Sequence, residues 1–168
     1  MAGLVPQDWE KPCAFWRFAG NIPVRMFLPL VIPELAIHGW DIRSRFETPA
    51  SLSAASVPVL LGRIPGLLAF PGVGRFRLDA GVPQPVCYRC ALTGAVSGTY
   101  DIQVENDTAR IAPVGAAPPH VIFRCAADIF VLLMYRRLTL EPRMQAGHLT
   151  VEGDPRLTAA FDRWLKRA

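Results

Sequence analysis

The spacing of apolar residues changes near Gly72, and this change limits the folds that the chain can adopt. Before Gly72, apolar residues recur at helical intervals, although prolines interrupt them. After Gly72, apolar and polar residues alternate, most clearly over Val86–Leu92 and Thr99–Glu105. Alternation with a period of two is typical of strands that bury one face. The sequence therefore predicts an α+β fold, an antiparallel sheet packed with helices and preceded by a helical arm.

Other stretches after Gly72 also have the residue types of strands. Thr108–Val114 follows Asn106-Asp107, a dipeptide typical of turns, and is predicted to form a hairpin with the strand before it. The remaining predicted strands are Val73–Leu78, Val121–Cys125 and His148–Glu152. We expect all of them to join one antiparallel sheet in meander order.

Two helices are predicted in the last third of the chain. One begins near Ala127-Asp128 and carries Arg136 and Arg137 in its last turn, where they complement the helix dipole. The other begins after Asp154, which is a favourable N-cap, with Pro155 at the first helical position. Its apolar residues recur at helical spacing as far as Leu165.

The first part of the chain is predicted to be helical but broken. Pro23 suits the first turn of a helix, whereas Pro29 and Pro33 interrupt the pattern that follows. We expect a helix to restart at Pro33 and to run to about Phe46. A second helical segment, about Leu52–Phe70, contains two further prolines and is expected to kink.

Length and composition fit one domain with an extension. Of 168 residues, 51% are hydrophobic and 19% are charged, which is enough apolar material for a core. We assign residues 1–50 to the helical arm and residues 51–168 to the α+β domain. The longest apolar run, Met26–Ala36, is broken by prolines and a glutamate and is too short to cross a bilayer. Because no signal-like segment opens the chain, we expect a soluble cytoplasmic protein without stable membrane insertion.

The basic residues do not form a nucleic-acid footprint. The net charge is +4, and arginine supplies nearly all of the 18 basic residues. These arginines are scattered along the chain, whereas nucleic-acid binding needs a clustered basic stripe. We therefore expect no nucleic-acid partner.

The Cys87-Tyr88-Arg89-Cys90 segment has the spacing of some zinc and redox motifs. It lies within a predicted strand, however, and residues three apart on a strand point to opposite faces. Two thiols that point apart cannot share a metal or form an unstrained disulfide. We expect free thiols, at least one of them in the core.

The C-terminal run of Ala127-Asp128-Ile129 and Gly147–Pro155 resembles the sterol carrier protein type 2-like family. Members of that family end with a strand, a helix, a short strand and a final helix, and the resemblance covers roughly residues 70–168. It implies a hydrophobic cavity between the sheet and the helices. The side chains expected to contact a ligand are Trp40, Tyr88, Phe123, Phe130 and Met134.

A second stretch, Pro33–Ile42, resembles the last bundle helix of mycothiol-dependent maleylpyruvate isomerases, which carry a DinB-like metal-binding bundle. In that family an E-x-x-x-H pair binds a divalent metal, and a sterol-carrier-like domain follows the bundle. Here only about thirty residues precede Glu34, and no histidine precedes His38. Two ligands make a poor zinc site, so we expect the metal site to be degenerate and no cofactor to be bound.

Glu34, His38 and Asp41 share one stripe of the predicted helix and are the candidate catalytic residues. One interpretation is a polar stripe that helps the helix to dock. The other is an acid–base group facing a cavity, because a carboxylate can hold histidine in one tautomer and tune it to neutral pH.

This pattern favours a protein that binds an apolar or aromatic small molecule. If the protein is an enzyme, we expect it to catalyse the metal-free isomerisation or cyclisation of that molecule in a biosynthetic pathway. Aromatic residues concentrated in the arm would expose a large apolar patch unless they cover the sheet domain, form a dimer surface or wall a ligand cavity. We expect the arm to fold onto the sheet domain, its own or a partner's, and a homodimer to form. The aromatic residues of the arm are Phe15, Trp16, Phe18, Phe27 and Trp40.

Two alternatives remain. The first is a zinc- and mycothiol-dependent isomerase or transferase, in which Glu34 and His38 bind the metal and another subunit completes the site. His120 and His148 are the histidines that a second copy would offer. The second alternative is a lipid carrier without catalysis, and catalytic turnover would distinguish it from the favoured small-molecule isomerase or cyclase.

Overall fold

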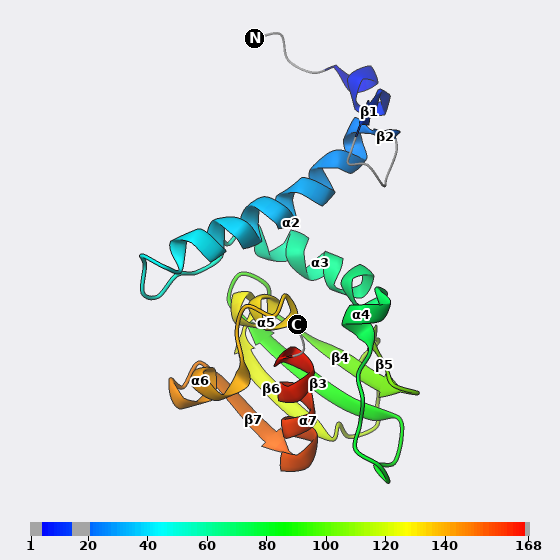
Figure 1. The fold of residues 1–168 in the computed structure, drawn as a ribbon, viewed down its shortest axis with the longest axis vertical. Helices are drawn as coiled ribbons and strands as arrows, with labels where there is room; N and C mark the ends of the chain where they lie inside the picture. The colour runs from blue at the N-terminus through cyan, green and yellow to red at the C-terminus, as the bar shows by residue number, and fades with distance from the viewer. Residues whose placement is uncertain (1–4, 15–20, 167–168) are drawn as a thin grey trace. The chain divides into compact units, whose positions relative to one another are not determined.

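A computed structural model describes residues 5–14 and 21–166, which fall into two compact units, Met1–Leu52 and Ser53–Ala168 (Figure 1). Each unit is described by itself. The arm residues Phe15, Trp16 and Phe18, which the dimer prediction invokes, lie outside the described residues.

The first unit consists of short elements followed by one long helix. The elements are η1 (Pro6–Glu10), β1 (Pro12–Ala14), β2 (Asn21–Pro23) and α2 (Val24–Arg43). Strands β1 and β2 pair antiparallel, and Arg25 at the start of α2 forms a salt bridge with Glu10 at 2.8 Å. A turn follows α2, in which the backbone N–H of Ser44 donates to the carbonyl of Trp40 at 2.8 Å.

Helix α2 corrects the prediction that prolines break this segment. It begins at Val24, runs through Pro29 and Pro33, and ends at Arg43 rather than near Phe46. Each internal proline removes one N–H donor and crowds the preceding turn, but its fixed φ is itself helical. Proline therefore destabilises a helix but does not prevent it. The prediction was wrong because it assumed that the helix must be interrupted at these prolines.

The second unit is built on a five-stranded sheet. The strands are β3 (Val86–Thr93), β4 (Gly98–Glu105), β5 (Thr108–Ala112), β6 (Val121–Ala126) and β7 (Leu149–Gly153). They lie in the order β5-β4-β3-β6-β7, and every neighbouring pair is antiparallel except β3 and β6. The α+β fold class is thus confirmed.

The predicted meander order holds only for β3, β4 and β5. After β5 the chain crosses to the other side of β3, where β6 pairs with it in parallel. The predicted strand Val73–Leu78 is also absent from the described structure: α4 (Pro71–Gly74) occupies its start, and Arg75 makes one isolated bridge with Thr108. Alternation shows which residues share a face, but it does not show which strands are neighbours.

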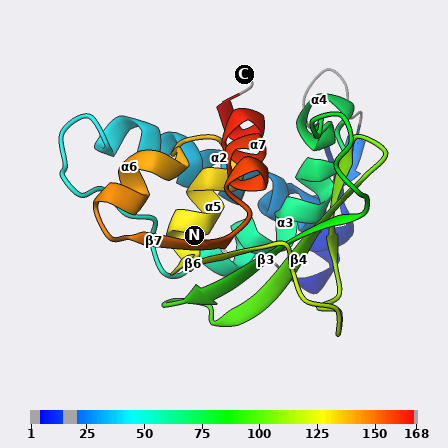
Figure 2. The ribbon, with the colours of Figure 1, turned by 90° about the horizontal axis from the view of Figure 1, so that it is seen from below.

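Helices cover one face of this sheet. They are α3 (Val57–Leu68), α4, α5 (Ala127–Met134), α6 (Leu140–Gln145) and α7 (Pro155–Lys166). Figure 2 shows α3, α5 and α7 on the same side of the strands. Within the described residues, no helix is long and apolar enough to cross a membrane.

The ends of two helices test the capping predictions. Asp154 caps α7 as predicted, because its Oδ1 accepts the backbone N–H of Arg156 at 2.7 Å. Helix α5 ends earlier than predicted, so Arg136 and Arg137 follow it instead of forming its last turn. Arg136 has φ +59°, and the N–H groups of both arginines bond back to carbonyls of α5, which is a Schellman motif.

The core lies between the sheet and α7. Alternate residues of β3 are buried on this face, and Tyr88 and Cys90 are fully buried. Aromatic rings form a continuous cluster there, with centroids 4.7 to 6.1 Å apart, made of Phe76, Tyr88, Phe123, Phe161 and Trp164. Stacked and tilted rings at such distances add to the stabilisation from apolar burial.

The other face of the sheet carries charged pairs. The carboxylate of Asp101 is 1% exposed and accepts two hydrogen bonds from Arg89, at 2.8 and 2.9 Å, and one from the backbone N–H of Gly115 at 3.0 Å. Beside it, Arg124 pairs with Glu152 at 3.1 Å, and both side chains are half exposed.

Candidate ligand-binding site

A cavity of about 340 Å³ opens within the second unit, between helix α3 and the helix-covered face of the sheet. Helix α3 forms one wall, and α5, β4, β5 and the β3–β4 turn form the rest. The lining residues are Pro58, Leu61, Gly62, Ile64, Pro65, Val96, Tyr100, Ile111 and Phe130.

The sequence of α3 explains why this space exists. Leu60, Ile64 and Leu68 are buried and hold the helix in place, and α3 packs on α5 and β5. Gly62 has no side chain to fill the space beside them: a Cβ atom there would meet nothing within 4 Å. Gly62 is exposed, so no side chain covers the cavity at this point of α3.

The chemistry of the cavity lining is almost wholly apolar. Tyr100 on β4 supplies the one polar side chain among the lining residues, and none of them is charged at neutral pH. The Tyr100 hydroxyl has no hydrogen-bond partner within the described part of the chain. Cavities of this kind, apolar with a single polar group, are typical of small-molecule sites.

Of the side chains predicted to bind a ligand, Phe130 lines this cavity. Tyr88 and Phe123 instead pack in the aromatic cluster, 0% and 3% exposed, and the Tyr88 hydroxyl donates to the carbonyl of Leu157 at 3.1 Å. Met134 is likewise buried. In the first unit, the indole N–H of Trp40 donates to the carbonyl of Ala50 at 3.0 Å.

Sequence reasoning missed most of the lining. Tyr100 lies on the same sheet face as Ile102, because both pair with buried residues of β3. The alternation of residues along this strand could therefore have placed Tyr100 on the helix-covered face. No sequence pattern indicated that Gly62 lines a cavity, because a glycine within a helical segment indicates only that the helix is less stable there.

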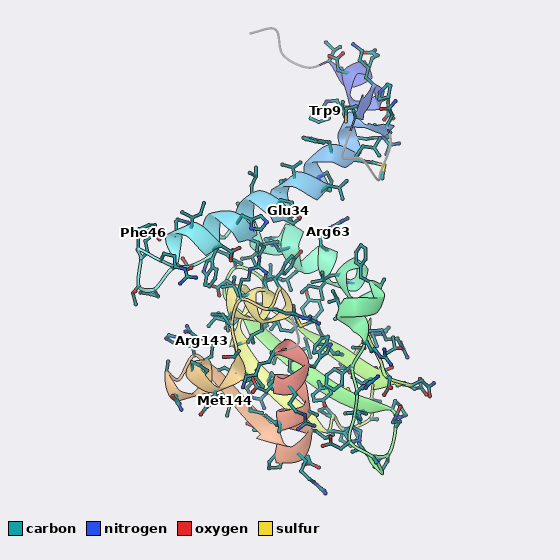
Figure 3. All side chains as sticks on the ribbon, in the orientation of Figure 1. Trp9, Glu34, Phe46, Arg63, Arg143 and Met144 are labelled. Carbon is teal, nitrogen blue, oxygen red and sulfur yellow. The ribbon has the colours of Figure 1, made fainter. Side chains whose placement is uncertain are left out.

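The candidate catalytic residues do come together on α2. Nε2 of His38 lies 3.3 Å from Oε2 of Glu34, and Nδ1 lies 3.1 Å from Oδ2 of Asp41. Figure 3 labels Glu34 on this helix. Spacings of three and four residues place the imidazole between two carboxylates. Their catalytic role remains a prediction.

The metal-binding and thiol side chains are spread over the described residues. Among residues 5–14 and 21–166, no group of three or more His, Cys, Asp or Glu side chains is placed to hold a metal ion. A zinc site would thus need a ligand from elsewhere. Cys13, Cys87, Cys90 and Cys125 are free thiols. Cys90 is buried and Cys87 is only partly buried, as the strand argument predicts, and Cys125 is buried as well.

Burial makes these thiols weak nucleophiles. It raises the pKa of Cys87 to about 11, with the nearby Asp101 carboxylate adding to the effect. It raises the pKa of Cys125 to about 12 and that of Cys90 well above its usual value. All three are protonated at neutral pH, whereas thiol chemistry needs the thiolate.

Comparison with known proteins finds similarities for the larger unit. Solved structures with a similar fold include UbiJ-SCP2, a ubiquinone synthesis protein, at 15% identity and a TM-score of 0.47, covering 64% of this chain and 94% of that one. They also include Sterol Carrier Protein 2 Like 2 of Aedes aegypti, at 15% identity and a TM-score of 0.44, covering 65% and 95%. No curated protein sequence matches the chain. Residues 86–166, from the start of β3 to the end of α7, match the family model of the SCP-2 sterol transfer family.

Proposed function

We propose that this protein binds a neutral apolar or aromatic small molecule in the cavity between α3 and the sheet. The observation that carries the proposal is the cavity itself, about 340 Å³ in volume and lined by apolar side chains with one hydroxyl. The match of residues 86–166 to a sterol transfer family supports it, because such domains bind apolar lipids and small molecules.

The size of the cavity favours a compact ligand. Small-molecule sites usually range from about 300 to 1,000 Å³, so this one lies near the lower limit. Each Å² of apolar ligand surface removed from water contributes about 25 cal/mol to binding. A ring compound that fills the cavity gains from this term, whereas a longer molecule would leave part of its surface in solvent.

Two glycines of α3 give a matched test. Gly62 lines the cavity and Gly66, one turn later, does not, and a Cβ atom at either position meets nothing within 4 Å. Leucine at either position improves helix propensity by about 1 kcal/mol, so both variants should fold at least as well as the parent chain.

Binding should distinguish the two variants. We expect Gly62→Leu to weaken the binding of a small apolar probe such as 1-naphthol at least ten-fold, because the new side chain occupies the cavity. Gly66→Leu should leave binding unchanged. Calorimetric titration of the full chain measures both, and equal binding by the two variants would contradict the proposal.

We also propose that the protein converts its ligand, with Glu34, His38 and Asp41 as the acid–base group. In this proposal the active protein is a homodimer in the cytoplasm. The observation that favours it is the imidazole held between two carboxylates on α2. Conversion of a bound ligand that stops in His38→Gln would support catalysis. Recovery of the ligand unchanged would favour the carrier alternative.

A further inference from the structure

The Tyr100 hydroxyl differs from the buried tyrosine hydroxyl elsewhere in this domain. Tyr88 donates to the carbonyl of Leu157 at 3.1 Å, so its hydroxyl is satisfied by the fold. Tyr100 is half-buried at the cavity, and its hydroxyl finds no partner in the described part of the chain. Without a ligand, water can satisfy it. A ligand that fills the cavity must replace that water or leave the hydroxyl unpaired.

The sheet holds Tyr100 in the cavity wall. Tyr100 pairs with Cys90 in the register of β3 and β4, and its chain neighbours Thr99 and Asp101 also pair with β3. Its ring leans along the strand toward Gly98, where a Cβ atom would lie 3.6 Å from the ring and 3.8 Å from the hydroxyl oxygen. These are ordinary van der Waals distances, so the ring packs along the strand over Gly98.

The rest of the lining offers no partner to a charged group. None of the other lining side chains carries a polar atom, so an ionised carboxylate or amine in the cavity would have no counter-charge. Burial of an unpaired charge is strongly unfavourable. A single hydroxyl, by contrast, can donate to or accept from one neutral oxygen.

We propose that Tyr100 is the specificity-determining residue of the cavity, and that it selects neutral ring compounds bearing one hydrogen-bonding oxygen, such as phenols, alcohols or ketones. These bind in preference to hydrocarbons of the same shape and to carboxylates. The volume corresponds to about eleven waters at ~30 Å³ each, which suits one or two fused rings. This inference rests on the proposed function, since it concerns the same cavity.

The test uses three two-ring probes that differ in one group: naphthalene, 1-naphthol and 1-naphthoate. Calorimetric titration of the full chain at neutral pH should show 1-naphthol binding about five-fold more tightly than naphthalene, the gain expected of one net hydrogen bond. The ionised 1-naphthoate should bind most weakly. In Tyr100→Phe, the affinity for 1-naphthol should fall to that for naphthalene. The affinity for naphthalene itself should stay within about two-fold of its value in the parent chain.

Ile111→Val is the matched control, because it changes the shape of the same wall without changing its polarity. It should weaken naphthalene and 1-naphthol by the same factor. Retention of the 1-naphthol advantage in Tyr100→Phe, or its absence in the parent chain, would overturn the role of Tyr100 while leaving the cavity as a binding site. If none of the three probes binds the parent chain, the proposed function itself fails.

Discussion

At the scale of single residues, the least exposed charge of the domain is neutralised by a fixed partner. Asp101 lies on the sheet face that the helices leave open, yet its carboxylate is 1% exposed because Arg89 and the Gly115 backbone enclose it. The hydrogen bonds from Arg89 hold the pKa of Asp101 below its ordinary value. A lowered pKa in the folded state means that the ionised form stabilises the fold.

Asp101→Asn should therefore lower the free energy of unfolding by about 3 kcal/mol at neutral pH, since it leaves the Arg89 charge without its partner. Glu152→Gln is the control on the same face: its pair with Arg124 is half exposed, and its loss should cost about 0.5 kcal/mol. Denaturant titrations of both variants give the two values. Equal losses would show that burial of the pair has no effect.

The same pair predicts a pH dependence. The contribution of Asp101 is fully present above the pKa that this carboxyl has in the unfolded chain, near 4, and is lost as pH falls toward its lower folded value. The difference in unfolding free energy between the parent chain and Asp101→Asn should thus shrink below about pH 4. Denaturant titrations from pH 7 to pH 3 measure it, and a constant difference would argue against the lowered pKa.

Gly153 at the end of β7 is a second residue whose identity the fold dictates. It has φ +118°, and a Cβ atom there would overlap the carbonyl oxygen of His120 and lie 2.9 Å from Cα of Val121. Gly147 also has a positive φ, +71°, but open space around it. Gly153→Ala should cost about 3 kcal/mol or more and Gly147→Ala about 1 kcal/mol, as thermal unfolding would show.

At the scale of elements, the N-cap of α7 offers a direct test. Asp154→Ala removes the acceptor for the Arg156 N–H and should destabilise the domain by about 1 kcal/mol. Asp154→Ser keeps an acceptor and should retain most of that energy. Thermal unfolding compares the two variants, and equal midpoints would mean that the cap does not stabilise α7.

Elements that local chemistry specifies were predictable from the sequence, and those that distant contacts specify were not. The Asn106-Asp107 turn and the Asp154-Pro155 start of α7 are encoded by the residues themselves. The parallel pairing of β3 with β6 depends on residues that are far apart in the chain. The cavity has the same character: Phe130 could be named as a candidate from the sequence as an aromatic residue of a predicted helix, whereas nothing in the sequence marks Gly62 as part of a cavity wall.

At the scale of the whole molecule, the chain divides into two units at Leu52 and Ser53. The second unit contains the whole five-stranded sheet, its covering helices and the cavity. We therefore expect a fragment of residues 53–168 to unfold cooperatively and to bind 1-naphthol like the full chain. Chemical denaturation and calorimetric titration of that fragment test both points, and loss of cooperativity would show that the first unit stabilises the second.

The order of strands in the sheet also has a consequence for how the protein is made. Tyr88 of β3 is covered by α7, and the residue whose carbonyl accepts its hydroxyl, Leu157, lies 69 residues later. A ribosome adding about 5 to 20 residues per second takes roughly 3 to 14 s to synthesise that interval. For most of that interval, from the end of β4 at Glu105 onward, the apolar face of β3 and β4 lacks the cover that α7 later provides. Aggregation during synthesis, rather than unfolding afterwards, is then the hazard that this chain order creates, and chaperones that bind apolar segments would act on it in that interval.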